Sequence, residues 1–254
     1  MWGQGDYPAV ARLLEPGAIR LADACHITPG RKVLDVAAGT GNFALAAEAR
    51  GALVTACDFT PHMIDLGRSR SESAGRLIDW VPGDAEDLPF PDRSFDLVAS
   101  VFGAMFAPRP DLVTSELFRV CRGDGLVAMA NYSWGGFLWS MAKLFEKYSQ
   151  RLAFELPSPF EWGDQVVVRR RLATLARDID IQTDVLTWTF ASVDVGLEFW
   201  ERTNGPTLAL KMTTPPDRYA AFLADTRSLM DRLNSSTDGR LELTSSYVRV
   251  LARR

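Results

Sequence analysis

The stretch Val33-Leu34-Asp35-Val36-Ala37-Ala38-Gly39-Thr40-Gly41 decides the fold of this chain. Its first residues form a nearly continuous apolar run, which is typical of a strand buried on both faces of a parallel sheet. Two glycines follow, and an alanine-rich helical segment begins at Asn42. Because glycine lacks a side chain, a ligand can approach the backbone N–H groups at the start of this helix. The stretch therefore predicts a ligand-binding loop in an α/β fold.

Strand-like and helix-like runs alternate on both sides of this loop. Predicted strands cover residues 32–36, 53–57, 77–81, 95–100 and 125–130. Predicted helices cover residues 16–27, 42–50, 61–74 and 112–121. This alternation is typical of right-handed crossovers in a doubly wound parallel sheet. Ligands of such sheets bind beyond the carboxyl ends of the strands, so the residues that follow strands are the candidates for function.

The second half of the chain has longer helical stretches and two late strands. The predicted helices cover residues 132–150, 165–178, 193–204 and 216–233, and the predicted strands cover residues 181–190 and 241–252. The predicted fold class is α/β, Rossmann-like and doubly wound. We expect a seven-stranded, mostly parallel sheet with an antiparallel last strand and a helical lid inserted after the fifth strand.

Composition excludes several classes of protein. The chain has 254 residues, is 47% hydrophobic and carries a net charge of -4, so nothing attracts it to a nucleic-acid backbone. We interpret Arg169-Arg170-Arg171 as a solvated helix face. Cys25, Cys57 and Cys121 form no Cys-x-x-Cys pair, which predicts buried residues in a reducing cytoplasm and no metal site. No secretory signal or membrane-spanning run is predicted.

Acidic residues end three successive predicted strands. Asp35 precedes the glycines, Asp58 ends the second strand, and Asp84 follows the third. An acid at the end of the second strand can accept hydrogen bonds from ribose hydroxyls, and one after the third can accept from an adenine amine. Two alternatives stay open here. Asp58 and Asp84 can simply cap the following helices, and Gly39-Thr40-Gly41-Asn42-Phe43-Ala44 also fits the dinucleotide-binding pattern.

Five motifs occur together between residues 30 and 130. They are Val33–Gly41, Val54-Thr55-Ala56-Cys57-Asp58, Gly83-Asp84-Ala85-Glu86-Asp87-Leu88-Pro89-Phe90, Ser94-Phe95-Asp96-Leu97-Val98 and Glu116-Leu117-Phe118-Arg119-Val120. In this combination the chain resembles the class I methyltransferases that use S-adenosylmethionine (SAM), in particular the small-molecule enzymes of the ubiquinone/menaquinone-biosynthesis-like group. Trp2 and Gly5-Asp6-Tyr7 resemble the N-terminal segment that covers the cofactor in some members.

The resemblance implies a cofactor site at the strand ends. Its predicted residues are Tyr7, Asp35, Ala37, Gly39, Gly41, Asp58, Phe59, Met63, Asp84, Ala85 and Ser100. Asp35 would orient the loop and lie near the methionine amine of SAM, and Ser100 would face the methionine portion. Asp58 would bind the ribose. The loop would approach the cofactor with its backbone.

The same resemblance implies how adenine is held. Phe59 and Met63 would flank the ring, and Asp84 and Ala85 would read its edge. The chain departs from the family at Ala37, where many members have glycine, and we expect a negative φ there. It also has Arg122-Gly123-Asp124-Gly125 in place of the usual Arg-Pro-Gly-Gly turn, a change that affects no catalytic residue.

The acceptor side is less well defined. Methyl transfer needs alignment of acceptor, methyl carbon and sulfur, with a base where the acceptor must lose a proton. Tyr132, Glu161 and His62 are the weak candidates for that base, while Arg109 is interpreted as a loop charge. Aromatic residues gather after the fifth predicted strand, at Tyr132, Trp134, Phe137, Trp139, Phe145, Tyr148, Phe160 and Trp162. They are interpreted either as a lid over an aromatic acceptor or as packing.

The predicted organisation is one SAM-binding domain over residues 1–254. Its stretches are a helical cap (1–29), the cofactor-binding core (30–133), a helical lid with the acceptor region (134–178), and C-terminal strands and helices that complete the sheet (179–254). The predicted function is cytoplasmic, SAM-dependent methylation of an O, N or C atom of a small hydrophobic or aromatic molecule, in secondary metabolism. S-adenosylhomocysteine is the expected product, and no nucleic acid or membrane partner is expected.

Three alternatives remain. A SAM-binding cyclase or a scaffold protein would use the cofactor without transferring its methyl group. A nicotinamide-dependent oxidoreductase would use the dinucleotide pattern of the glycine loop, although Asp84 and the two late strands argue against it. A homodimer is left open as the assembly.

Overall fold

The computed structural model of the chain describes residues 5–149 and 157–254. The chain divides into two compact units. Unit 1 comprises residues 1–13, 133–155 and 185–246, and unit 2 comprises residues 14–132, 156–184 and 247–254. The stretch 134–178, predicted as a lid, contributes residues to both units. Its role as a lid, and the functional unity of the predicted single domain, stay predictions.

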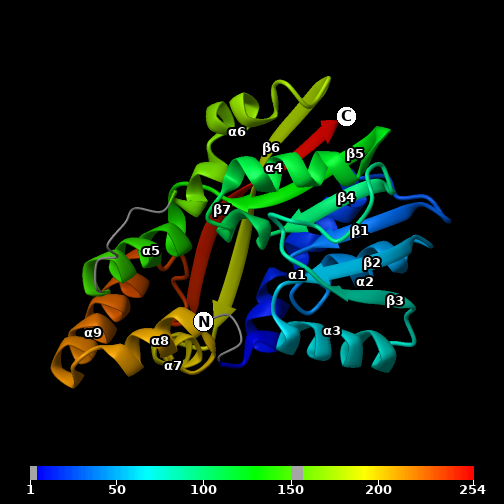
Figure 1. Cartoon of the computed structure of the whole chain (residues 1–254). Helices are drawn as coiled ribbons and strands as arrows, with labels where there is room; N and C mark the ends of the chain where they lie inside the picture. Colours follow the sequence, from blue (N-terminus) through cyan, green and yellow to red (C-terminus); the bar gives the residue numbers. More distant parts are fainter. Residues whose placement is uncertain (1–4, 150–156) are drawn as a thin grey trace. The chain divides into compact units, whose positions relative to one another are not determined.

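A seven-stranded sheet runs through the described residues in the order β3-β2-β1-β4-β5-β7-β6 (Figure 1). The strands are β1 (Lys32–Val36), β2 (Leu53–Asp58), β3 (Ile78–Pro82), β4 (Phe95–Val101), β5 (Cys121–Tyr132), β6 (Asp178–Phe190) and β7 (Leu241–Arg253). Parallel pairing joins β3, β2, β1, β4 and β5, and β7 pairs antiparallel with β5. The predicted mixed sheet with an antiparallel last strand is confirmed.

The strand order reverses at β1, which lies between β2 and β4. Val33, Leu34 and Val36 of β1 are fully buried, as are Leu97 and Val98 of β4. Because both faces of the sheet are covered at β1, this strand has an apolar run instead of an alternating pattern. A ligand cleft of a doubly wound sheet lies at such a reversal, beyond the strand ends. The fold therefore places the ends of β1, β2 and β4 where a site is expected.

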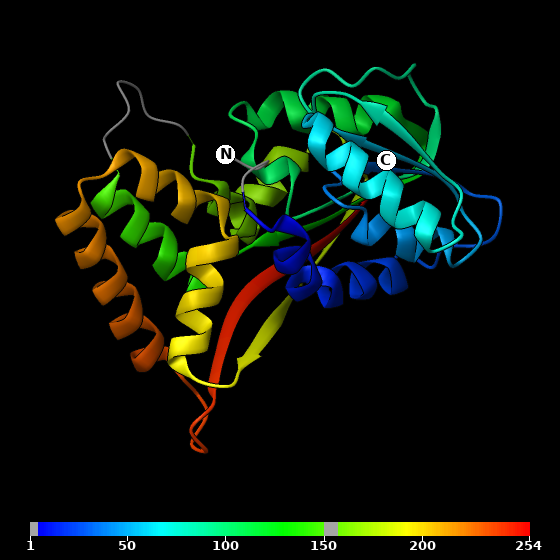
Figure 2. The same ribbon diagram turned by 90° about the horizontal axis from the view of Figure 1, so that it is seen from below.

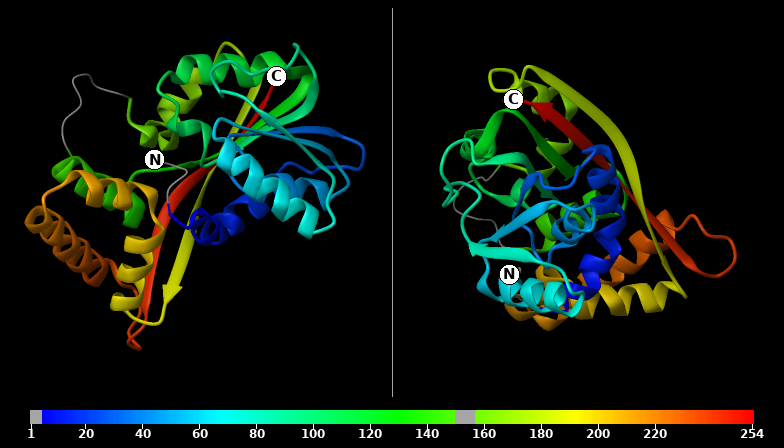
Figure 3. Two further views of the ribbon diagram at one scale, coloured as in Figure 1. Left: turned by 60° about the horizontal axis from the view of Figure 1, so that its bottom comes forward. Right: turned by 90° about the vertical axis from the view of Figure 1, so that its right-hand side faces the viewer.

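Helices and short helical turns complete unit 2 around these strands (Figure 2). They are α2 (Asn42–Glu48), α3 (Pro61–Ser73), the 3-10 turn η1 (Ala104–Phe106), α4 (Pro110–Val120), the 3-10 turn η2 (Pro159–Gly163) and α6 (Gln165–Leu172). Asp164 caps α6, where its carboxylate accepts the N–H groups of Val166 and Val167. At the sheet edge, β6 and β7 lie side by side (Figure 3).

Unit 1 contains four helices within the described residues, with an aromatic interior. They are α5 (Gly136–Tyr148), α7 (Val193–Thr203), α8 (Gly205–Thr213) and α9 (Pro216–Leu233). Phe137 contacts both Trp188 and Trp200, and these three rings are at most 4% exposed. The Tyr148 hydroxyl donates to Asp225 at 2.7 Å, which joins α5 to α9. For Phe137 and Tyr148, the structure thus shows the packing role that the sequence left open.

Helix α1 (Tyr7–Ala24) corrects the predicted start at Pro16, because Pro16 lies inside the helix. Proline removes one N–H from a helix interior and usually ends or kinks it. Here a row of small and aliphatic side chains is buried along α1, including Leu14, Ala18 and Leu21. Burial of that face outweighs the lost hydrogen bond.

Further elements differ from the prediction. The predicted helix over 132–150 is α5 from Gly136 to Tyr148, because β5 continues to Tyr132, and the predicted helix over 165–178 ends at Leu172, with β6 beginning at Asp178.

β5 begins at Cys121, not at Gly125, since Cys121 pairs with Phe95 before a register shift in which Leu97 pairs with Leu126. Helix α8 was missed altogether. Asn204 caps it by accepting the Thr207 N–H at 3.1 Å, and a proline stands in its first turn. An Asn-Gly-Pro sequence is a helix start of this kind.

All three cysteines are buried, as predicted, and burial raises the pKa of the Cys57 thiol to about 12. Among the described residues, each helix falls short of the length and apolarity that crossing a bilayer requires.

Candidate functional site

Asp35 lies at the end of β1 and fixes the start of α2. Its side chain is 1% exposed, and its carboxylate accepts the Ala44 N–H at 3.0 Å. Burial raises the pKa of Asp35 to about 8; the Ala44 hydrogen bond opposes this shift and the charge of Asp58 adds to it. Asp35 therefore holds the first turn of α2, directly after the glycine loop. Its predicted orientation of the loop and its place beside the methionine amine stay predictions.

Asp58 at the end of β2 binds the same loop from the neighbouring strand. One carboxylate oxygen accepts the Gly39 N–H at 2.8 Å, and the other accepts the Thr60 N–H at 2.8 Å. Burial raises the pKa of Asp58, and these two N–H donors oppose that shift. The Thr60 side chain and the Phe59 backbone also donate to this carboxylate. These contacts show the local capping role, and ribose binding stays a prediction.

Gly41 shows why the loop needs glycine. Its φ is 83°, and a Cβ there would lie 3.0 Å from the ring of Trp80. The Trp80 ring also lies against Gly67 of α3, where a Cβ would come within 2.1 Å of it. Trp80 therefore fills the space between the glycine loop and α3, a role that the sequence did not reveal.

The expectation of a negative φ at Ala37 is wrong, because its φ is 53°. The left-handed residue lies where β1 ends, and the N–H of the next residue, Ala38, donates to Cys57 O at 3.0 Å. Gly103 lies close by, since a Cβ on it would come within 2.4 Å of Ala37 O. An L-residue with this φ is destabilised by about 1–2 kcal/mol.

Substitutions at Ala37 test this correction. We expect Ala37→Gly to keep the fold and change the free energy of unfolding by about 1 kcal/mol or less, because glycine relieves the strain but gains unfolded-state entropy. Ala37→Val should destabilise by about 2 kcal/mol or more, since a β-branched residue is a genuine outlier at positive φ. Urea denaturation of both variants measures the difference. Equal stability of the two would contradict a left-handed Ala37.

Asp84 and Ala85 begin the β3–β4 loop, which comprises residues 83–94. Asp84 is half-buried, and its carboxylate accepts the Glu86 N–H at 2.9 Å in a local turn. Ala85 is buried. Glu86 is 7% exposed and accepts from both the backbone N–H and the Nε of Arg109, each at 2.6 Å. Arg109 is therefore not merely a loop charge: it ties this loop to the start of α4.

Three predicted residues lie around the start of α3. Phe59 directly follows Asp58 and is 76% exposed, so its ring is free to cover a planar ligand. Met63 is 2% exposed and belongs to the core, and His62 is exposed on the first turn of α3. No contact in the structure supports His62 as a base, and the three cofactor or base roles stay predictions.

The two remaining predicted cofactor residues lie in different units. Ser100 in β4 is 1% exposed, and its hydroxyl oxygen accepts the Ala104 N–H at 3.0 Å. It therefore holds the turn that follows β4. Tyr7 is the first residue of α1 and belongs to unit 1. Trp2, which was part of the weaker N-terminal resemblance, lies outside the described residues.

An aromatic cluster lies beyond the ends of β4 and β5, within unit 2. Phe102 stacks on Tyr132 with ring centroids 4.5 Å apart and planes at 8°. Phe106 meets Tyr132 edge-on at 6.3 Å, Phe160 lies 6.4 Å from it, and Tyr247 meets Phe102 edge-on at 5.3 Å. We call these five rings the aromatic cluster. Phe102 and Tyr247 are members that the sequence did not single out.

Glu161, another candidate base, is held in an ion pair. Its carboxylate accepts from Arg171 Nη2 at 2.6 Å, and the Arg171 guanidinium lies 4.8 Å over the ring of Trp162. The Glu161 side chain is 37% exposed. The ion pair engages one carboxylate oxygen of Glu161 with Arg171. Its role as a base stays a prediction.

Two buried polar atoms at the strand ends lack a hydrogen-bond partner in the described structure. They are Thr40 Oγ1 in the glycine loop and Asn131 Nδ2 next to Tyr132. A buried group without a partner costs about 1–3 kcal/mol, so such atoms are expected where a ligand satisfies them. Together with the exposed Phe59 ring, they fit a ligand that has both polar groups and a planar ring, as SAM does.

Comparison with known proteins agrees with this geometry. The family described as "Methyltransferase domain" matches residues 34–129. An uncharacterised protein of Mycobacterium tuberculosis is 35% identical over 210 residues, which cover 82% of this chain and 77% of that protein. A demethylmenaquinone methyltransferase of Clavibacter sepedonicus is 39% identical over 116 residues, which cover 45% of this chain and 47% of that protein.

The fold agrees as well. A crystal structure from Bacillus halodurans, named as that of a "putative methyltransferase", has a TM-score of 0.63 and 21% identity, and the match covers 93% of this chain and 97% of that chain. This chain therefore belongs to the class I SAM-dependent methyltransferases. Family membership supports SAM over a nicotinamide dinucleotide as the cofactor, and the glycine loop as its binding site stays a prediction. Within residues 5–149 and 157–254, no three His, Cys, Asp or Glu side chains are grouped to hold a metal ion.

Proposed function

We propose that this methyltransferase acts on a small hydrophobic or aromatic molecule and methylates an O, N or C atom of it. The observation that carries the proposal is the aromatic cluster, because parallel and edge-on rings offer flat apolar surfaces to a planar acceptor. Phe106 is 37% exposed, so part of the cluster is accessible to such a molecule. The relative named demethylmenaquinone methyltransferase adds support, although it matches less than half of this chain.

When bound, SAM supplies an activated methyl group on a sulfonium. The chain's own residues then have to align the acceptor, keep water away and accept a proton where the acceptor loses one. Asp58 holds the glycine loop through the Gly39 N–H, and Asp35 holds the first turn of α2 through the Ala44 N–H, so both would keep this side of the proposed cofactor site rigid. The aromatic cluster, at the ends of β4 and β5, would hold the acceptor. In this proposal, alignment by rigid elements contributes most of the catalysis, and Tyr132 is the candidate for proton transfer.

Tyr132 offers the clearest test of the acceptor side, since its ring belongs to the cluster and its hydroxyl can take part in proton transfer. We expect Tyr132→Phe to keep the affinity for SAM and to lower kcat/KM for the acceptor about tenfold, the effect of one lost hydrogen bond. Tyr132→Ala should also raise the acceptor KM, because it removes the stack on Phe102. Steady-state kinetics measure both. An unchanged kcat/KM in Tyr132→Phe would exclude a role for the hydroxyl.

The proposed activity itself is tested with SAM labelled in its methyl group. The purified protein is incubated with phenols, quinols and aromatic amines, and the label is followed into the organic product. Label in one of these classes, with matching formation of S-adenosylhomocysteine, supports the proposal and identifies the methylated atom. Conversion of a substrate without S-adenosylhomocysteine would instead support a cyclase-type use of the cofactor. Exclusive labelling of a hydrophilic acceptor would contradict the proposal.

We also propose that the enzyme works in the cytoplasm, in secondary metabolism, without a nucleic-acid or membrane partner. The net charge of -4 and the three buried, unpaired cysteines support this setting. Sedimentation of cell lysate tests it, with the protein expected in the supernatant at low and high salt. The same preparation, analysed by light scattering, decides between a monomer and a homodimer.

A further inference from the structure

The motif Glu116-Leu117-Phe118-Arg119-Val120 resembles the family, yet none of the roles described so far uses it. Its two charged residues lie near the end of α4 and bind each other in a fork. Arg119 Nε donates to Glu116 Oε1 at 2.6 Å, and Arg119 Nη2 donates to Glu116 Oε2 at 2.7 Å. Their side chains are only 14% and 29% exposed, so the pair is better shielded than an ordinary surface ion pair.

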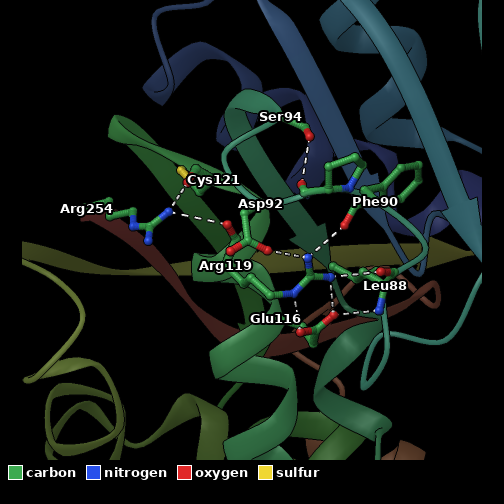
Figure 4. Close-up of polar contacts among 9 residues, drawn as sticks. Leu88, Phe90, Asp92, Ser94, Glu116, Arg119, Cys121 and Arg254 are labelled. Carbon is green, nitrogen blue, oxygen red and sulfur yellow. Dashed lines mark hydrogen bonds and ion pairs between the residues drawn. The ribbon is translucent and has the colours of Figure 1, made fainter.

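The pair forms hydrogen bonds with the backbone of the β3–β4 loop (Figure 4). Leu88 N–H donates to Glu116 Oε2 at 2.7 Å, and Leu88 O accepts from Arg119 Nη2 at 2.9 Å. Arg119 Nη1 donates to Phe90 O at 2.7 Å and pairs with Asp92 at 2.9 Å. Both polar groups of the Leu88 backbone are therefore bound by one side-chain pair. The Arg119 guanidinium also binds Phe90 and Asp92, further along the loop.

The ends of the loop are fastened to α4 as well. Arg93 N–H donates to Arg119 O at 2.9 Å, and Ser94 N–H donates to Val120 O at 2.8 Å. At the other end, Glu86 binds Arg109, which caps α4. The loop itself contains only an isolated bridge between Asp84 and Asp87 and no helix or strand. Its conformation is therefore set mainly by its contacts with α4.

The chemistry of the pair suits this purpose. Arginine has a planar fork of donors that can serve a carboxylate and two carbonyls at once, whereas lysine is a single flexible point charge. The hydrogen bond to Arg119 holds the pKa of Glu116 below its usual range, so Glu116 stays ionised and accepts the Leu88 N–H. A neutral pair would hold the same backbone less firmly.

We propose that Glu116 and Arg119 are positioning residues for SAM, which hold the β3–β4 loop in the conformation in which Asp84 and Ala85 bind adenine. The inference rests on the family's use of SAM and on the proposed role of Asp84. The pair does not touch the cofactor. It acts through the loop, so its loss should weaken every ligand that contains adenine, whatever the ligand's other end.

The test uses two adenine ligands. S-adenosylhomocysteine has both adenine and the amino-acid end, and 5′-methylthioadenosine has adenine without the amino-acid end. We expect Arg119→Ala to weaken both by a similar factor of about ten, the scale of a misplaced binding group. By contrast, Asp35→Asn should weaken S-adenosylhomocysteine only. Kinetics should show a raised KM for SAM with kcat at saturation changed less than about twofold.

Arg122→Ala is the matched control, because Arg122 forms an ion pair with Asp96 of β4, outside the β3–β4 loop, and its side chain is 41% exposed. It should leave the affinity for both ligands unchanged. If Arg119→Ala does not fold, Glu116→Gln replaces it. Glutamine keeps an oxygen for the Leu88 N–H but loses the charge, so a smaller weakening of about threefold is expected.

Hydrogen exchange gives a readout of the loop itself. The Leu88 amide should exchange faster in Arg119→Ala, with Arg119→Lys intermediate. Unchanged exchange at Leu88, or equal losses of affinity in Arg119→Ala and Arg122→Ala, would overturn the inference. Failure of the wild-type protein to bind either ligand would instead contradict the SAM site itself, so the two failures are distinguishable.

Discussion

Asp35→Asn is expected to make the unliganded protein more stable at high pH while weakening its binding of SAM. Asp35 is buried beside Asp58 without a cation, and burial raises its pKa to about 8. The unfolded chain loses the same proton near pH ~4. The favourable contribution of the protonated carboxyl is therefore complete below pH ~4 and is lost as the pH rises through about 8.

Asparagine has no charge to lose and can still accept the Ala44 N–H. The stability difference between variant and wild type should therefore be small at about pH 5 and reach the order of a few kcal/mol at about pH 9. Urea denaturation at both pH values measures it. The assigned environment of Asp35 would be contradicted if the free energy of unfolding of the wild type, relative to that of Asp35→Asn, increased between about pH 5 and about pH 9.

Whereas Asp35→Asn should stabilise the unliganded protein at high pH, the same substitution should weaken SAM binding. SAM carries an ammonium and a sulfonium, and both favour an ionised Asp35. We expect Asp35→Asn to weaken SAM by about 10- to 100-fold, the value of one charged hydrogen bond. Calorimetry in buffers of different ionisation heat should show that the wild type releases a proton on binding at pH 7. Equal affinity of variant and wild type would place Asp35 away from the amine.

Asp58→Ala is expected to have the largest effect on the cofactor. The substitution removes the acceptor for the Gly39 and Thr60 N–H groups and, with it, the predicted partner of the ribose hydroxyls. Two charged hydrogen bonds at about 1.5–3 kcal/mol each correspond to a loss of at least ~100-fold in SAM affinity. The SAM affinity of Asp58→Asn should lie between those of Asp58→Ala and the wild type, since the asparagine amide keeps one acceptor oxygen.

Asp65→Ala serves as the matched control, because Asp65 is an exposed carboxylate of α3 that pairs only loosely with Arg68 at 3.7 Å. Its SAM affinity should equal that of the wild type. Calorimetric titration of the three variants measures the series. A loss in Asp65→Ala as large as that in Asp58→Ala would mean that general charge, not the position of Asp58, controls binding.

Local patterns were sufficient for the sheet and for the two acids at the ends of β1 and β2. β1 and β2 are short apolar runs ending in Asp35 and Asp58, and parallel pairing necessarily brings such ends to one edge of the sheet. The start of α9 at Pro216 also carried a clear local sequence pattern, with proline in the first turn. These features depend on neighbours in sequence or on strand order alone.

Features that depend on tertiary contacts were beyond local patterns. The positive φ of Ala37 occurs where Gly103, distant in sequence, packs closely against it, and the interior Pro16 is tolerated because α1 buries one face. The partners of Glu86 and Arg119 lie in segments distant along the chain. Phe102 and Tyr247 join the aromatic cluster only through the order of β4, β5 and β7.

The most direct test of the central claim is calorimetric titration of the wild-type protein with SAM and S-adenosylhomocysteine, with its fold verified by circular dichroism. We predict saturable one-site binding of both ligands, which Asp58→Ala weakens and Asp65→Ala does not. A folded wild-type protein that binds neither ligand would contradict the assignment of the glycine loop, Asp35 and Asp58 to a SAM site.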